Sequence, residues 1–140
     1  MAFGEKLFEE TGKVTNMSVE SVHPVEGTKM KVNFVSEIRG FGNFPSGRNI
    51  GSGTINQYPH GVWDASYQGV IITQGGDHYM WWAHEKSRTS EDGSKVRGLV
   101  TITGYTQSQK LASLNKLIIV AEVEFNPAAL EFSAIGYEWK

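Results

Sequence analysis

Residues 70–82 read VIITQGGDHYMWW, two runs of β-branched and aromatic residues joined by a pair of glycines. Such runs on either side of Gly75-Gly76 are typical of two antiparallel strands connected by a tight turn. If these glycines form a two-residue loop, Ile72 lies opposite Tyr79. The register of this hairpin decides which side chains of both strands share a face.

The same punctuation continues in both directions along the chain. Turn signals recur at Glu26-Gly27, Pro45-Ser46-Gly47, Pro59-His60-Gly61, Asp92-Gly93 and Asn126-Pro127. The segments between them predict strands at 13–23, 28–41, 48–58, 62–73, 78–89, 95–106, 117–125 and 129–139. Leucine spacing predicts a short helical turn near 109–116, and residues 3–10 are expected to form a short helical turn as well. Consecutive strands of this number indicate an all-β fold, a closed or nearly closed eight-stranded antiparallel up-and-down barrel, because closure removes exposed edges.

Length and composition limit what the protein can be. The chain has 140 residues, a formal net charge of −2 and no cysteine. The length predicts a single domain over 1–140, and the charge balance argues against a nucleic-acid-binding surface. Without cysteine there is no thiolate metal site, disulfide or cysteine nucleophile. The charged segment Met1–Gly12 does not resemble a signal peptide, and no apolar run is long enough to span a membrane, so a cytoplasmic protein is expected.

A second hairpin fixes the face that points inward. If Asp92-Gly93 is also a two-residue loop, Glu85 lies opposite Val100 and Trp81 lies opposite Gly104. Together the two hairpins predict one shared inner face, made of Val62, Asp64, Ser66, Gln68, Val70, Ile72, Tyr79, Trp81, Ala83, Glu85, Val96, Val100 and Ile102.

This inner face is apolar toward one end and polar toward the other, which is typical of a small-molecule site. An eight-stranded barrel has room for packed side chains or for one small ligand. The sequence therefore predicts a binding barrel for a small apolar or amphipathic molecule, without a cofactor. The expected ligand-binding residues are Trp81, Tyr79, Val70, Gln68, Ser66 and Ile102.

Asp64 and Glu85 are expected to be diagonal neighbours on the inner face. Two carboxylates in a shared, desolvated site have proton affinities that are pushed apart, so that one can act as a general acid or base. This pattern leaves open an enzyme, an isomerase, cyclase or hydrolase, that uses Asp64 or Glu85. The alternative interpretation is that both carboxylates are solvated at an open end of the barrel.

Other chemistry finds little support in the sequence. His78 and His84 share a strand face, but six residues of strand separate them by roughly 20 Å, so no metal site is expected. There is no G-x-S-x-G motif. Gly51-Ser52-Gly53 does not lead into a helix, as a phosphate-binding loop would, and is interpreted as a turn or a bulge.

The opposite face of the same strands carries large apolar side chains, four aromatic ones and a methionine, namely Trp63, Tyr67, Met80, Trp82 and Tyr105. Large apolar patches on the outside of a protein usually meet a partner, so these residues predict a homo-oligomer. The alternative is that residues 1–12 fold back and cover the patch.

The layout resembles the allene oxide cyclase-like, calycin-type barrels. The resemblance depends on Gly51-Ser52-Gly53-Thr54 in one strand, Tyr67-Gln68-Gly69 in the next, the Gly75-Gly76 hairpin and the turn Gln109–Leu114. It covers residues 12–139 and implies a barrel. The plant enzymes of this group bind a fatty-acid-derived epoxide and are trimers, and none of their catalytic residues matches a position here. Lipocalin-like barrels, which usually have a disulfide, and nitrobindin-like barrels, which need an interior histidine for haem, are alternative relatives.

Overall fold

The computed structural model describes residues 3–140. Their segments rich in Val, Ile, Thr and aromatic residues form long strands, as β-branched and aromatic side chains favour. The strands are β1 (Phe3–His23), β2 (Gly27–Gly40), β3 (Gly47–Tyr58), β4 (Val62–Thr73), β5 (His78–Thr89), β6 (Val96–Tyr105), β7 (Ile119–Asn126) and β8 (Glu131–Trp139). Two short 3-10 turns, η1 (Pro59–Gly61) and η2 (Ala112–Lys116), lie between strands.

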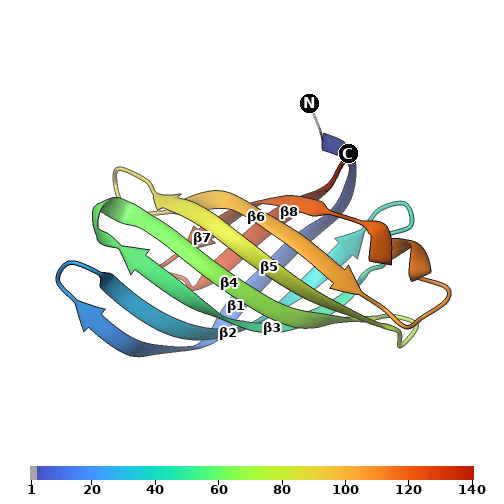
Figure 1. The fold of residues 1–140 in the computed structure, drawn as a ribbon, viewed down its shortest axis with the longest axis horizontal. Helices are drawn as coiled ribbons and strands as arrows, with labels where there is room; N and C mark the ends of the chain where they lie inside the picture. The colour runs from blue at the N-terminus through green and yellow to red at the C-terminus, as the bar shows by residue number, and fades with distance from the viewer. Residues whose placement is uncertain (1–2) are drawn as a thin grey trace.

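Each strand pairs with the next, and β8 pairs with β1, so the sheet closes into an eight-stranded antiparallel barrel (Figure 1). This confirms the predicted up-and-down fold, with η2 in the place expected for the helical turn. The start of β1, the C-terminus and η2 lie toward the right-hand end in Figure 1. The β1–β2, β3–β4 and β5–β6 turns lie at the other end. Neither 3-10 turn of residues 3–140 has the length and hydrophobicity of a membrane-spanning helix.

The N-terminal segment was expected to be helical, and that prediction is wrong. Residues 3–12 form the first half of β1, which pairs with the second half of β2 on one side and with β8 on the other. They therefore form part of the barrel wall. The alternative that residues 3–12 fold back over the outer aromatic patch is therefore wrong. Met1 and Ala2, the remainder of the expected cover, lie outside the described residues.

The two central hairpins differ in how well their register was predicted. In β5–β6, Glu85 lies opposite Val100 and Trp81 opposite Gly104, as expected. In β4–β5, Tyr79 lies opposite Ile71 rather than Ile72. The β4–β5 loop has three residues, 74–76, because Thr73 N–H donates to the Asp77 carbonyl.

Glycine in a left-handed conformation completes this three-residue loop. Gly76 has φ of +88°, as the last position of such a hairpin loop requires. The additional loop residue shifts β4 by one position relative to β5, and a shift of one residue turns every side chain of a strand to the other face. The predicted inner face is therefore correct for β5 and β6 and inverted for β4.

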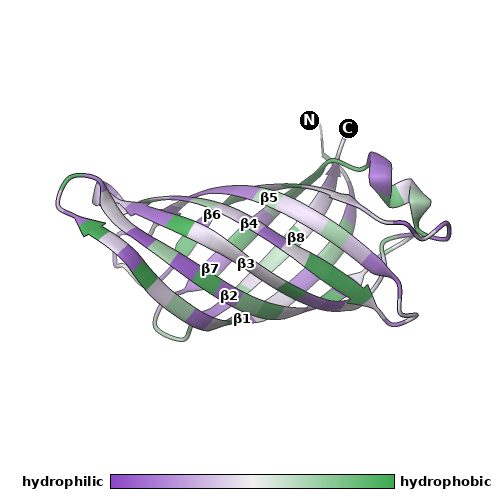
Figure 2. Ribbon diagram, turned by 60° about the horizontal axis from the view of Figure 1, so that its bottom comes forward, coloured by the Kyte–Doolittle hydropathy of each residue, from purple (hydrophilic) through white to green (hydrophobic). Residues whose placement is uncertain are grey.

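Polar and apolar residues alternate along the strands, as the ribbon coloured by hydropathy shows (Figure 2). The inward residues form one continuous core along the whole barrel. At the end that carries the termini, Phe44 of the β2–β3 loop is buried and packs on Phe8 and Tyr79, with ring centroids 5.2 and 6.1 Å away. This end of the barrel is therefore plugged by an aromatic side chain.

Candidate functional site

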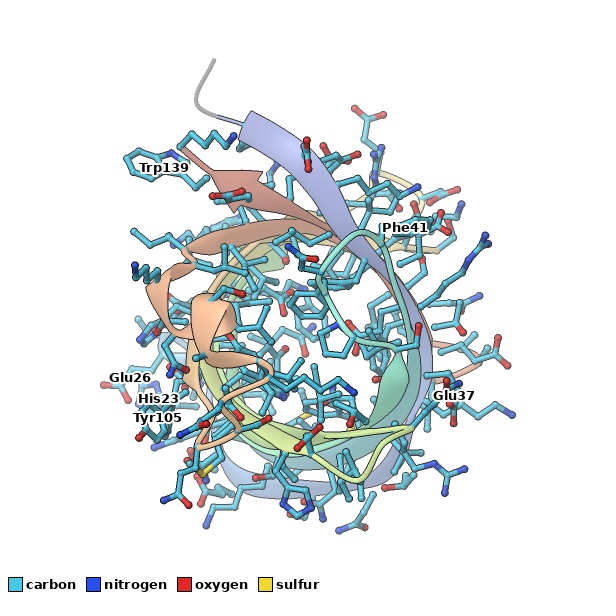
Figure 3. The ribbon with its side chains drawn as sticks, turned by 90° about the vertical axis from the view of Figure 1, so that its right-hand side faces the viewer. His23, Glu26, Glu37, Phe41, Tyr105 and Trp139 are labelled. Atoms are coloured by element: carbon cyan, nitrogen blue, oxygen red, sulfur yellow. The ribbon has the colours of Figure 1, made fainter. Side chains whose placement is uncertain are left out.

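The barrel encloses a cavity of about 120 Å³. Seen along the barrel axis, side chains crowd the interior, while the labelled Glu37 and Tyr105 lie outside the ring of strands (Figure 3). The cavity wall is mostly aromatic and aliphatic, and its polar members are Glu10, Asn49, Tyr67, Tyr79 and Glu85. An apolar wall with a few polar groups is the usual composition of a small-molecule site.

Bare backbone on the inner face gives the aromatic rings room to lie flat. Gly51 of β3 and Gly69 of β4 lie opposite each other. A Cβ atom at Gly51 would lie 2.5 Å from the Phe34 ring, and one at Gly69 would lie 2.6 Å from the Trp81 ring. The interpretation of Gly51-Ser52-Gly53 as a turn or bulge is therefore wrong, since these residues lie within β3 and keep its inner face flat.

Phe34 lies at the centre of the aromatic wall. Its ring is edge-on to Tyr67 and to Phe132, with centroids 5.6 and 5.7 Å apart, and tilted against Trp81 at 6.1 Å. Aromatic pairs favour these offset and edge-to-face arrangements. Two polar clusters border this group of rings, and each is centred on a glutamate.

The Glu10 cluster joins four strands and consists of Glu10, Ser36, Asn49 and Trp81. Ser36 Oγ and Asn49 Nδ2 both donate to Glu10 Oε2, the latter over 3.1 Å. Trp81 Nε1 in turn donates to Asn49 Oδ1 over 2.7 Å. Burial raises the pKa of the Glu10 carboxyl, and the hydrogen bonds from Ser36 and Asn49 oppose that rise. Glu10 Oε1 has no hydrogen bond within residues 3–140 and is left for another donor.

The Glu85 cluster is local and consists of Glu85, Tyr67 and Ser87. Tyr67 Oη donates to Glu85 Oε1 over 2.7 Å, and Ser87 Oγ donates to Glu85 Oε2. Burial, together with the neighbouring Glu85 carboxylate, raises the pKa of Tyr67 well above 10.0, so its hydroxyl stays protonated and donates. Both oxygens of Glu85 therefore accept a hydrogen bond from a neighbouring hydroxyl.

Tyr79 contributes a polar atom without a partner. The side chain is 1% exposed, and its hydroxyl oxygen is buried with no hydrogen bond in the part of the chain that the structure describes. The ring lies over Gly104 of β6, where a Cβ atom would approach the hydroxyl to 2.4 Å. Burial raises the pKa of Tyr79 to about 12, so this group is a neutral hydroxyl that can donate or accept.

The structure separates the residues that were expected to form the site. Trp81, Tyr79, Ile102 and Glu85 lie on the cavity wall. Four residues of β4 were expected to point inward, and that prediction is wrong because the three-residue β4–β5 loop turns them outward. They are Asp64, Ser66, Gln68 and Val70. Asp64 is half-buried, and its Oδ2 lies 3.8 Å from Nζ of Lys86.

The same shift brings two aromatic residues inward. Trp63 was expected on the outer face but is 8% exposed, and its Nε1 donates to Thr89 Oγ1 over 2.7 Å. Tyr67 lines the cavity beside Glu85. Met80, Trp82 and Tyr105 do lie on the outer face, where they are 39%, 50% and 47% exposed.

Three polar residues of the cavity region were missed by sequence reasoning, namely Glu10, Ser36 and Asn49. Glu10 was missed because residues 3–10 were interpreted as helical. One signal was available: β2, expected at 28–41, is longer than its expected partner 13–23, so its second half needs a strand formed by residues before Lys13. Across residues 3–140, no three histidine, cysteine or acidic side chains gather as a metal site would require.

No protein-family model matches the sequence, and no curated protein resembles it significantly. Among solved structures, the fold is similar to a protein of unknown function from Clostridium acetobutylicum ATCC 824, with a TM-score of 0.84 and 16% identity over 100% of both chains. It is also similar to a β-barrel-like protein from Acinetobacter baumannii AYE, with a TM-score of 0.82 and 14% identity over 97% of this chain and 94% of that one.

An enzyme from Penicillium herquei also has a similar fold, with a TM-score of 0.65 and 17% identity over 99% of this chain and 96% of that one. At these identities the likeness concerns the fold alone. The chain therefore shares its architecture with small β-barrel proteins of unknown function and with one enzyme.

Proposed function

We propose that the protein binds a small apolar or amphipathic molecule inside the barrel. The observation that carries this proposal is the cavity of about 120 Å³, which has an aromatic wall and polar groups from four strands. An engineered apolar cavity of ~150 Å³ binds benzene. Drug-sized ligands occupy pockets of ~300–1,000 Å³. The cavity therefore suits a ligand of a few heavy atoms rather than a fatty-acid chain.

The ligand size also bears on the resemblance to allene oxide cyclase-like barrels. The architecture is compatible with that group. The fatty-acid-derived substrate of its plant enzymes needs far more room than this cavity offers, so we propose a smaller ligand for this chain.

A titration with small neutral molecules such as benzene or 1-butanol tests the proposal, with tryptophan fluorescence and the indole N–H resonances as readouts. We expect the signal of Trp81 to respond, and the response to disappear in Trp81→Phe. Ala121→Leu, which fills the cavity from β7, should abolish binding. The matched control Thr101→Leu, on the outer face of β6, should bind as the unmodified protein does. Binding that survives Ala121→Leu would contradict the proposed site.

A second candidate function is acid–base catalysis, an isomerase, cyclase or hydrolase reaction. It is favoured by the raised pKa of Glu10, because a carboxyl that holds its proton closer to neutral pH can act as a general acid. Glu85 is the other candidate, whereas Asp64 lies outside the cavity. Variants Glu10→Gln and Glu85→Gln that bind a ligand but no longer convert it would support catalysis over simple binding.

We further propose that the protein self-associates through the outer face. Val35, Ile50, Val70, Met80 and Tyr105 lie opposite one another across β2 to β6 and form an uncharged outer belt, with Trp82 beside it. Burying such a surface against a second copy is favourable by ~25 cal/mol per Å². Sedimentation equilibrium should show an oligomer that Trp82→Lys weakens. A monomer at micromolar concentration would contradict this proposal.

A further inference from the structure

The cavity contains acidic side chains without any basic side chain to balance them. Glu10 and Glu85 both line it, and no lysine, arginine or histidine is found among its lining residues. The ion pairs of residues 3–140 all involve other carboxylates. Acidic side chains inside a protein are usually paired with a cation. Here each carboxylate is held only by neutral donors, which are Ser36 and Asn49 for one and Tyr67 and Ser87 for the other.

The remaining lining adds π faces to these acceptors. Phe34, Tyr67, Trp81 and Phe132 lie in one connected group of rings around the middle of the cavity. The face of an aromatic ring attracts a cation, and a ring of such faces is a recurrent way to bind organic ammonium groups. Aromatic faces and carboxylates therefore favour the same sign of charge in a ligand.

A third, independent feature indicates a polar ligand. Tyr79 is one of the residues that line the cavity, and its hydroxyl is almost completely buried and has no hydrogen-bond partner among residues 3–140. A buried polar atom without a hydrogen bond is costly, and its cost is removed when a ligand supplies the missing partner. As a neutral hydroxyl, Tyr79 can accept a hydrogen bond from an N–H group.

We infer that the ligand of the barrel is a small organic cation, an alkyl or aryl ammonium of about five to seven heavy atoms. Its nitrogen would bind to the free oxygen of Glu10 or to Glu85, and its carbon skeleton would pack against the aromatic rings. This inference rests on the proposed binding function and adds the charge of the ligand to it.

Three probes of the same length separate the charge from the apolar contact: n-butylammonium, 1-butanol and butyrate. Calorimetry and the indole resonance of Trp81 measure their affinities at neutral pH. We expect n-butylammonium to bind about tenfold more tightly than 1-butanol, which corresponds to ~1.4 kcal/mol. Butyrate should bind most weakly, because two carboxylates repel it.

Substitutions identify the groups responsible. Glu85→Gln and Glu10→Gln should each reduce the preference for n-butylammonium over 1-butanol several-fold and leave the affinity for 1-butanol nearly unchanged. Asp64→Asn and Glu9→Gln are matched controls, since each removes an acidic charge from the outer face beside one of these residues. If Glu10→Gln does not fold, the effect of Glu85→Gln and the selectivity of the unmodified protein still test whether the ligand is a cation.

The outcomes distinguish this inference from the function on which it rests. Equal affinity for n-butylammonium and 1-butanol, or a preference for butyrate, overturns the inference and leaves the binding function intact. A preference for the cation that survives both glutamine variants also overturns it. If none of the probes enters the cavity, the proposed binding function itself is wrong.

Discussion

Glu10 and Glu85 line one cavity, yet the barrel holds them in different ways. Glu10 on β1 accepts hydrogen bonds from Ser36 on β2 and Asn49 on β3, and Asn49 in turn accepts one from Trp81 on β5. Glu85 is held within one hairpin, by Tyr67 of β4 and Ser87 of its own strand. One glutamate therefore connects several strands of the barrel, whereas the other contacts only the two strands of a single hairpin. We expect the Glu10 cluster to dominate stability, whereas substitutions in the Glu85 cluster act mainly on ligands.

The largest effect should come from Asn49, which connects the two ends of the Glu10 cluster. Asn49→Leu leaves the buried Trp81 Nε1–H without an acceptor and removes one donor from Glu10. Each orphaned buried group costs ~1–3 kcal/mol. The free energy of unfolding should therefore fall by about 2–5 kcal/mol in urea denaturation.

Asn56→Leu is the matched control for Asn49→Leu. Asn56 lies on the same strand, points outward and makes no side-chain hydrogen bond to any of residues 3–140. Its replacement should change the free energy of unfolding by less than ~0.5 kcal/mol. Equal losses in both variants would show that the Glu10 cluster does not support the barrel.

The second prediction concerns the pH dependence of stability. Burial raises the pKa of Glu10 above its ordinary value of 4.5. Between that value and the raised one, the folded protein binds more protons than the unfolded chain, so the free energy of unfolding falls as the pH rises. Glu10→Gln does not ionise, so its stability relative to the unmodified protein should improve as the pH rises above 4.5.

Glu9→Gln should behave in the opposite way. A hydrogen bond from Lys6 lowers the pKa of Glu9, so ionised Glu9 stabilises the folded state above its ordinary pKa. The relative stability of Glu9→Gln should worsen as the pH rises toward 4.5 and stay constant above that value. Denaturation curves at several pH values measure both variants, and shifts of the same sign would contradict the different environments of these adjacent residues.

These neighbours also show what could be predicted from the sequence. The turns, the strand segments and the closed barrel could be predicted from local patterns, because glycine, proline, asparagine and aspartate mark the turns between the strands. The β5–β6 register was correct because its loop keeps Ser90 opposite Lys95. The β4 face was inverted because Gln74-Gly75-Gly76 forms a three-residue loop rather than the assumed Gly75-Gly76 pair, and both loops are compatible with a pair of glycines.

The Glu10 cluster could not be predicted from local sequence, because its residues are brought together by pairing between strands that are distant in the chain. Glu10, Ser36 and Asn49 meet only because β1 continues along β2 to meet β8. The spacing of Lys6 and Glu9 is equally compatible with one turn of helix and with an exposed strand, so local sequence did not decide between them. Closure of the barrel does decide, because β8 needs a partner.

The third prediction tests the Glu85 cluster. Tyr67→Phe removes the donor to Glu85 and keeps the ring that packs against Phe34. A hydrogen bond to a charged group contributes ~1.5–3 kcal/mol at most, and Glu85 keeps its second donor, so we expect a loss of about 1–2 kcal/mol. Tyr58→Phe, at an exposed position of β3, should have no measurable effect on the unfolding curve. A loss from Tyr67→Phe larger than that from Asn49→Leu would reverse the comparison between the two clusters.

The smallest effect is expected at Asp64, and it tests the register that separates the inner wall from the outer one. In the structure Asp64 points outward, its side chain is 48% exposed, and it forms an ion pair with Lys86 at 3.8 Å. Such an exposed pair contributes at most ~1 kcal/mol, so Asp64→Asn should change the free energy of unfolding by less than ~0.5 kcal/mol. It should also leave the affinity for 1-butanol and n-butylammonium unchanged. If β4 instead paired with Ile72 opposite Tyr79, Asp64 would be a diagonal neighbour of Glu85 inside the barrel, and its neutralisation would alter both stability and ligand preference. A change in ligand affinity of Asp64→Asn comparable to that of Glu85→Gln would therefore show that the three-residue β4–β5 loop is wrong.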